Sequence, residues 1–167
     1  VLRLGDNIEF IDIAGKSVNH DKSSRFDRVM REKGFVFPAT GINGEPNPQK
    51  DYDEGYLVTD ANHNVFHLKQ IKGRPFFRMI PLPDGVGIRH AFITEFPSRR
   101  TFGLLGDYDN RLYAVKAPDY EVAELPVGYF DASQDNLMII GDMFHWTIRI
   151  SGPSGERLYA IDATDYT

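Results

Sequence analysis

Four aspartates recur at the same place in short apolar segments of the chain. Each follows an apolar run and a small residue and precedes a second apolar run; they are Asp6, Asp60, Asp107 and Asp142. Carboxylates gathered on one face could bind a cation or sugar hydroxyls. Aspartate is also favoured in turns, because its side chain accepts a hydrogen bond from its own backbone two residues on. Turn chemistry accounts for the pattern without a ligand, and we favour that interpretation.

Two of the five histidines, His67 and His145, stand at similar places on the strand that follows an Asp turn. If those strands face a common axis, the two imidazoles could bind a metal ion together. A single histidine on a strand is more often hydrogen-bonded within the fold. The chain has no cysteine, which excludes disulfides and thiolate-bound zinc. We predict no cofactor.

Aromatic and acidic side chains in turns are the remaining candidates for a binding site. Most aromatics in the chain are expected to pack in the core or across strands. Turn aromatics are less needed for packing, so a cluster of them with turn acids would bind a peptide or a saccharide. The predicted binding residues are Tyr52, Asp107, Tyr108, Asp109 and Phe144.

Motifs and composition favour a binding protein over an enzyme. There is no G-x-S-x-G elbow, no P-loop and no dinucleotide fingerprint in the sequence. The formal net charge of -5, with 19 Lys and Arg against 24 Asp and Glu, argues against a nucleic-acid partner. No run approaches the ~20 apolar residues that a membrane span needs.

Repeated hairpins must position these residues. Each of the four Asp segments forms the first strand of a hairpin, and the units around them add further strands. The pattern predicts a mainly β fold, an antiparallel meander of about four blade-like units, as in a small or distorted β-propeller; a β-sandwich is the alternative. The most complete unit has expected strands at 89–96, 101–106, 111–117 and 120–127. Leu158-Tyr-Ala-Ile161 also resembles Leu112-Tyr-Ala-Val115, which leaves the register of the repeat open.

Two segments depart from the β pattern. Residues 24–33 read as a short helix, with Ser24 as its cap and Gly34 after its end. Residues 41–54 form the longest polar loop. We expect one β-rich domain over residues 1–167, and the start at Val1 in place of Met indicates the soluble part of a longer protein. If the units close into a ring, the N-terminal strand should lie beside the last unit.

Several short segments resemble a family of uncharacterised bacterial envelope proteins. The resemblance rests on Ser24-Arg-Phe26, Lys33-Gly-Phe-Val-Phe-Pro38, Tyr52-Asp-Glu-Gly-Tyr56 and Val65-Phe-His-Leu-Lys69. Members look like membrane-anchored proteins found with ABC-transporter permeases. The resemblance implies that this chain is their extracytoplasmic part, on the periplasmic or outer face of the inner membrane. Any contact with the membrane would be made through a segment outside residues 1–167.

Three functions follow as expectations. The first is a non-enzymatic sensor or interaction domain of a transporter-linked membrane protein, whose partner is the permease or a second copy. The second is a saccharide-binding or carbohydrate-active module that uses the turn aromatics and acids. The third is a metal-binding domain built on His67 and His145.

Overall fold

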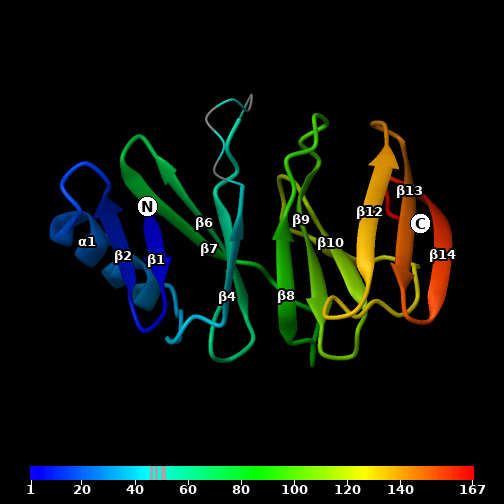
Figure 1. Ribbon diagram of the computed structural model, residues 1–167, viewed down its shortest axis with the longest axis horizontal. Coiled ribbons are helices and arrows are strands. Elements are labelled where there is room, and N and C mark those ends of the chain that lie inside the picture. The colour runs from blue at the N-terminus through cyan, green and yellow to red at the C-terminus, as the bar shows by residue number, and fades with distance from the viewer. Residues whose placement is uncertain (46, 48, 50–51) are drawn as a thin grey trace.

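The chain folds into four antiparallel sheets that lie side by side in chain order (Figure 1). The computed structural model describes residues 1–45, 47, 49 and 52–167. We call the sheets blades 1 to 4. Blade 1 holds β1 (Leu2–Leu4), β2 (Ile8–Asp12) and β3 (Ser17–Val18); blade 2 holds β4 (Gly41–Gly44), β5 (Tyr56–Thr59), β6 (Val65–Ile71) and β7 (Arg74–Met79); blade 3 holds β8 (Ile88–Ile93), β9 (Thr101–Asp107), β10 (Leu112–Lys116) and β11 (Val122–Glu124); blade 4 holds β12 (Asn136–Gly141), β13 (His145–Gly152) and β14 (Gly155–Asp162).

Consecutive strands pair in every blade, so each blade is a simple meander. The predicted mainly β fold with four blade-like units is confirmed. Blades 1 and 4 lie at opposite ends of the row, as do the two termini (Figure 1). The four blades therefore form an open arc, and the N-terminal strand does not lie beside the last unit.

Each pair of neighbouring blades is joined by its own apolar core. Between blades 1 and 2 the core contains Ile8 and Phe66, and between blades 2 and 3 it contains Leu57 and Leu105. Between blades 3 and 4 it contains Leu112 and Ile148. Because side chains alternate between the two faces of a strand, each middle blade contributes to two cores.

Helix α1 (His20–Glu32) follows blade 1 and packs against β2 and β7. It begins four residues earlier than predicted, because Asn19 rather than Ser24 caps it by accepting a hydrogen bond from the Lys22 N–H at 3.0 Å. Phe26 and Met30 are buried in the core between blades 1 and 2. The predicted Gly34 ends the helix with a positive φ of 87°.

Strand β4 (Gly41–Gly44) lies inside the predicted polar loop 41–54, so the first part of that loop prediction is wrong. The segment has two glycines and no apolar alternation, so its sequence does not indicate a strand. Pairing with β5 over its whole length makes it one. Residues 46, 48, 50 and 51 of the predicted loop lie outside the described residues.

The Asp turns do not all lie at equivalent positions. The turns at Asp6, Asp60 and Asp107 follow β1, β5 and β9. Strand β1 runs opposite to β4, β8 and β12 in Figure 1, which makes it the equivalent of a second strand. Asp142 instead follows β12, the first strand of its blade. The four-fold Asp repeat is therefore wrong at its last member, because a turn residue marks any hairpin regardless of its place in a blade.

The second internal similarity found in the sequence gives the correct register of the repeat. Leu112–Val115 and Leu158–Ile161 both lie on the third strand of their blades, β10 and β14. By this register blade 1 has second, third and fourth strands, while blade 4 has first, second and third strands.

The single described helix, α1, is 13 residues long. Within the described part of the chain, no helix is long and apolar enough to cross a membrane.

Candidate functional site

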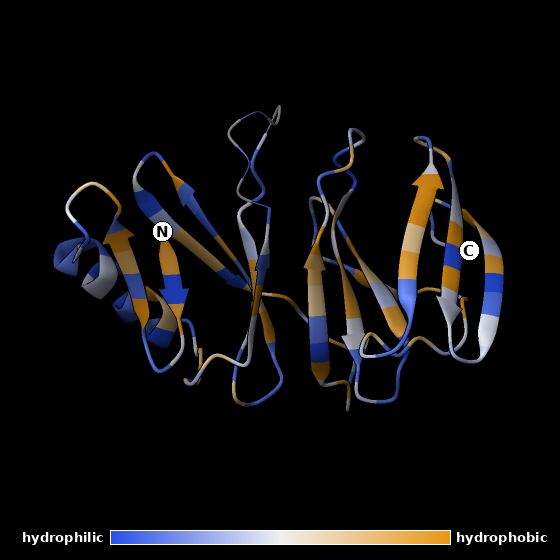
Figure 2. Cartoon of the chain, viewed as in Figure 1, coloured by the Kyte–Doolittle hydropathy of each residue, from blue (hydrophilic) through white to orange (hydrophobic). Residues whose placement is uncertain are grey.

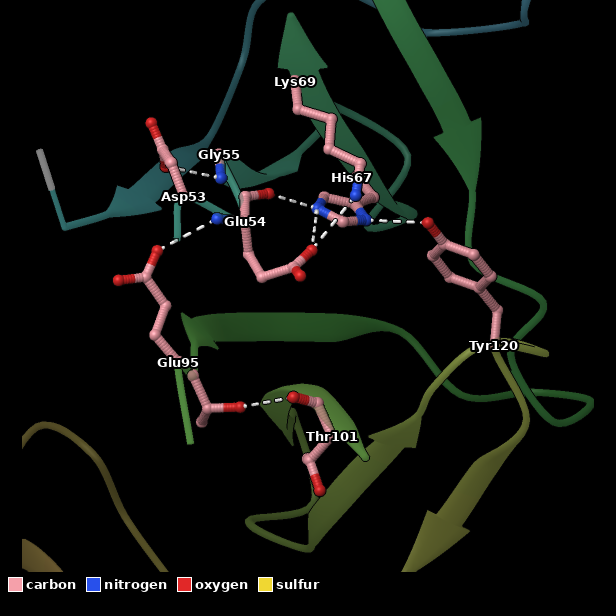
Figure 3. Close-up of polar contacts among 9 residues, drawn as sticks. Asp53, Glu54, Gly55, His67, Lys69, Glu95, Thr101 and Tyr120 are labelled. Carbon is pink, nitrogen blue, oxygen red and sulfur yellow. Dashed lines mark hydrogen bonds and ion pairs between the residues drawn. The ribbon is translucent and has the colours of Figure 1, made fainter. Parts of the chain in front are cut away.

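A buried polar cluster joins blades 2 and 3 around His67 (Figure 3). His67 on β6 is fully buried, and its Nδ1 lies 2.8 Å from the hydroxyl of Tyr120, which follows β10. Its Nε2 lies 2.5 Å from the main-chain oxygen of Glu54. A carbonyl oxygen can only accept, so Nε2 carries the proton and Nδ1 accepts from Tyr120. The neutral imidazole thus has both of its nitrogens satisfied by hydrogen bonds.

Charged side chains flank the His67–Tyr120 hydrogen bond. The carboxylate of Glu54 lies 3.1 Å from Lys69 Nζ and 3.9 Å from His67 Nε2. The guanidinium of Arg78 lies over the Tyr120 ring at 4.3 Å. Burial raises the pKa of Tyr120 to about 12, a rise that Arg78 opposes. Burial also lowers the pKa of His67, against the opposing hydrogen bond to Glu54.

The cluster fixes the chain that leads into β5. The Glu54 N–H donates to Glu95 Oε1 at 3.0 Å, and the Tyr52 hydroxyl donates to the Phe96 carbonyl at 2.7 Å. Both acceptors belong to the segment between β8 and β9. Because His67 is fully buried, a substrate cannot reach it. The cluster holds the chain before β5 against the β8–β9 segment.

The buried histidine predicts a dependence of stability on pH. Unfolded histidine binds a proton below pH ~6.5, whereas folded His67 does so only at lower pH, because its pKa is lowered. The free energy of unfolding should therefore fall as the pH falls below about 6.5, by at most about 1.4 kcal/mol per pH unit for one proton. Denaturant unfolding between pH 5 and 8 measures this slope.

The matched control for this prediction is His67→Gln, which keeps a donor and an acceptor at the site. Burial also lowers the pKa of His90, which adds a slope of the same sign to both proteins. The difference between wild type and His67→Gln isolates His67. Equal slopes in the two proteins would contradict the prediction.

Two adjoining cavities form a groove between blades 3 and 4. The larger has a volume of about 500 Å³ and the smaller about 250 Å³, and they share Phe96 and Ile139 in their walls. We call their union the blade 3–4 groove. Its apolar lining includes Phe92, Phe96, Leu104, Phe130, Leu137, Ile139, Met143 and Trp146.

The rim of this groove is acidic. Among the described residues that line the two cavities there are four carboxylates and no lysine or arginine; the acids are Glu45, Glu95, Asp135 and Asp142. The side chain of Asp135 is only 4% exposed and lies 3.6 Å from the guanidinium of Arg157, so the rim charge comes from the other three. Two arginines of the β8–β9 segment lie nearby. Arg99 lies over the Tyr52 ring at 4.1 Å. Arg100 lies 5.9 Å from the Phe144 ring and donates to the main-chain oxygen of Met143 at 3.4 Å. The groove therefore offers apolar contact together with negative charge.

The structure divides the predicted binding residues between two edges of the arc. Tyr52 and Phe144 lie beside the β8–β9 segment that borders the groove, though neither lines its two cavities. Asp107, Tyr108 and Asp109 form the β9–β10 turn, at the other end of strand β9. The five residues do not form one cluster.

The β9–β10 turn is held by Asp107. Its Oδ1 accepts from the N–H groups of Asp109 and Arg111 at 2.9 and 2.8 Å, and its Oδ2 accepts from the Tyr113 hydroxyl at 2.9 Å. Asp107 is only 3% exposed, so it has the turn role favoured from the sequence. Tyr108 is 52% exposed and lies against His63, with its hydroxyl 3.0 Å from the His63 Nδ1.

The two histidines predicted to share a metal ion lie in different blades. His67 is buried between blades 2 and 3, while His145 on β13 is 79% exposed and lies 3.8 Å from Asp142. Within the described residues, no group of three or more His, Cys, Asp and Glu side chains could hold a metal ion.

Sequence reasoning missed the role of two tyrosines. Tyr120 and Tyr166 both follow the third strand of a blade, with φ of 65° and 66°, and both N–H groups bond to the carbonyl four residues back. Tyr120 reaches His67 of blade 2, and Tyr166 reaches Thr101 of blade 3, with 2.6 Å between the two hydroxyls. Each tyrosine thus ties its blade to the preceding one. The matching segments Ala117-Pro-Asp-Tyr120 and Ala163-Thr-Asp-Tyr166 carry the signal.

Comparison with solved structures supports the propeller architecture. A structure described as "Structure of Dos1 propeller" superposes with a TM-score of 0.55 at 13% sequence identity, over 97% of this chain. This chain covers 41% of that chain, and so spans less than half of its length. At this identity the likeness concerns the fold alone.

Comparison at the sequence level identifies a family. A search of curated proteins finds no match. The model of the family described as "Domain of unknown function (DUF4857)" matches residues 1–161. Because this match covers nearly the whole sequence, the chain belongs to the DUF4857 family.

Proposed function

We propose that this chain is a non-enzymatic interaction domain that binds a basic segment of a partner protein in the blade 3–4 groove. The observation that carries the proposal is the groove itself, in which an apolar wall of aromatic and aliphatic side chains meets a rim with the carboxylates of Glu45, Glu95 and Asp142. A groove of this kind matches a peptide that alternates apolar and cationic residues. The same negative charge disfavours nucleic acid.

The position of the groove suits a recognition role. The β8–β9 and β12–β13 segments that border it project from the same edge of the arc (Figure 1). Hydrogen bonds from Tyr52 and Glu54 bring the chain before β5 to that edge. Chain segments from three successive blades thus meet there on a rigid β scaffold, an arrangement commonly used for binding.

The partner we propose is an ABC-transporter permease. The support is the resemblance of the sequence to membrane-anchored envelope proteins found with such permeases. In this proposal the domain lies on the extracytoplasmic side of the membrane and senses or contacts an exposed segment of the permease.

Overlapping synthetic peptides that cover the extracytoplasmic segments of the permease would test the proposal. Peptides containing Lys or Arg should bind in fluorescence polarisation, with an affinity that falls as salt is raised. Met143→Arg should weaken this binding by about tenfold or more, because it adds bulk and positive charge to the groove wall. Met143 is 48% exposed, so the variant should fold.

The matched control is Met79→Arg, a similarly exposed methionine (42%) on β7 of blade 2. It should leave binding unchanged. The proposal fails if no peptide binds, or if Met143→Arg and Met79→Arg bind as the wild type does.

A saccharide is the second candidate ligand, favoured by one specific observation. The smaller cavity, of about 250 Å³, combines Phe96 and Trp146 with Asp142 and Ser98 in its lining. Rings and carboxylates together suit a sugar, which offers an apolar face and hydroxyl groups. A rise of several degrees in melting temperature with one oligosaccharide, abolished in Met143→Arg, would favour this candidate over the peptide.

A further inference from the structure

The third strands of the blades carry equivalent residues that face the next blade. On β6 these are Val65 and His67, and on β10 they are Leu112 and Ala114. All four are fully buried, with exposures of 0%. The next blade covers them in each case.

The equivalent residues of blade 4 are exposed. By the match between Leu112–Val115 and Leu158–Ile161, the positions on β14 are Leu158 and Ala160. Tyr159 and Ile161, between and after them, pack toward blade 3, so Leu158 and Ala160 point to the other face. Leu158 is 62% exposed, although its counterpart Leu112 is completely buried.

Strand β12 adds apolar residues to the same face, beyond the polar Thr147 and Arg149 of the intervening strand β13. In one row across the blade, Met138 on β12 pairs with Arg149 on β13, which pairs with Leu158 on β14. In the next row, Ile140 pairs with Thr147, which pairs with Ala160. Met138 is 48% exposed and Ile140 is 64% exposed. Figure 2 colours much of β12 hydrophobic, in keeping with apolar residues on both of its faces. We call the surface of Met138, Ile140, Leu158 and Ala160 the blade 4 face.

The edge of β14 is also incomplete by comparison with blade 3. There the Tyr120 turn leads into β11, which pairs with β10 through Tyr113, Ala114 and Val115. The Tyr166 turn repeats this geometry, including the bond from the Asp162 N–H to Thr167 that matches the bond from Lys116 to Glu121. Within the described residues, β14 pairs only with β13. The outer edge of β14 is therefore open for pairing with a fourth strand.

The opposite end of the arc lacks a strand in the complementary position. Blade 1 has no equivalent of the first strands β4, β8 and β12, as its register shows. A cavity of about 710 Å³ lies beside β1, with Val1, Leu2, Ile42 and Gly44 in its lining. Both end blades thus leave apolar surface uncovered where a complete ring would place a strand.

We propose that the blade 4 face is covered by a further β blade of the same polypeptide, and that a fourth strand pairs with β14 beside it. The occupant follows from the type of strand that is absent. The Tyr166 turn directs the chain back along β14 as the Tyr120 turn directs it into β11, so the strand that completes blade 4 would come from the same polypeptide. A second copy would bring blades with the same two strands missing. This chain covers 41% of the chain whose solved structure is described as a propeller.

Thiol labelling tests the proposal, because the chain has no cysteine of its own. Leu158→Cys is introduced into the 167-residue chain and into the complete polypeptide that contains it, and its rate of reaction with a maleimide is measured. We expect fast labelling in the 167-residue chain and labelling slower by about tenfold or more in the complete polypeptide, because burial protects a thiol until local opening exposes it.

Two control variants give the labelling rates of an exposed and of a buried position. Met79→Cys should react quickly in both proteins, because its blade 2 position is exposed. Leu112→Cys, at the equivalent buried position of blade 3, should react slowly in both. Equal rates for Leu158→Cys in the two proteins would overturn the proposal. Protection that appears in the 167-residue chain as its concentration is raised, together with dimers in size-exclusion chromatography, would assign the face to a second copy and would also overturn it.

Discussion

Replacing Leu112 with alanine is expected to lower the free energy of unfolding by about 2–5 kcal/mol. Leu112 is fully buried in the core between blades 3 and 4, where it meets residues of both sheets, including Ile148 and Ile150. The variant loses the transfer free energy of the deleted methyl groups and leaves a cavity that the two sheets can close only in part. Denaturant unfolding with a constant m-value measures the change.

The repeat supplies a matched control for this experiment. Leu158→Ala removes the same atoms at the equivalent position of blade 4, where the side chain is 62% exposed. In the 167-residue chain it should change the free energy of unfolding by less than about 0.5 kcal/mol. Equal losses for the two variants would contradict the assignment of Leu112 to the core and of Leu158 to the surface.

Replacing Asp107 with alanine is expected to cost about 3 kcal/mol or more. The variant removes the acceptor of two backbone N–H groups and of the buried Tyr113 hydroxyl. Tyr113 is 2% exposed, so its hydroxyl would lose its partner away from water. The melting temperature and the chemical denaturation midpoint should both fall.

Asp142→Ala is the matched control for Asp107→Ala. Asp142 also accepts two backbone N–H groups, from Phe144 and His145 at 2.7 and 2.8 Å, but it lies on the surface with 69% of its side chain exposed. Water can replace these bonds, so the loss should be clearly smaller. A loss as large as that of Asp107→Ala would contradict the importance we give to the buried Tyr113 hydroxyl.

Alternation and turn residues predicted most of the strands. The expected strand 101–106 became β9 (Thr101–Asp107), and its neighbours differ from prediction by a few residues. Strand β4 could not be predicted, because glycine-rich Gly41–Gly44 is a strand only through its pairing with β5. The sequence also could not distinguish a turn after a first strand from a turn after a second one, which placed Asp142 in the wrong register.

The candidate site was less accessible to sequence reasoning than the fold. His67 looked like a possible metal ligand, and only the approach of Tyr120, 53 residues away, and of the Glu54 carbonyl shows that both its nitrogens are bonded. The blade 3–4 groove depends on how far two sheets diverge, which no local pattern encodes. None of the residues that line its two cavities was among the predicted binding residues; Tyr52 and Phe144 lie only beside the β8–β9 segment that borders it.

The two tyrosines that follow β10 and β14 give the arc a direction. Tyr120 reaches a residue made earlier in synthesis, and so does Tyr166. As the chain leaves the ribosome from its N-terminus, each new blade therefore meets a finished neighbour that already presents the group its tyrosine needs. Assembly can proceed one blade at a time, with each docking step completed before the next blade exists. A blade released from the C-terminal end would likewise leave the tyrosine contact of the blade before it intact.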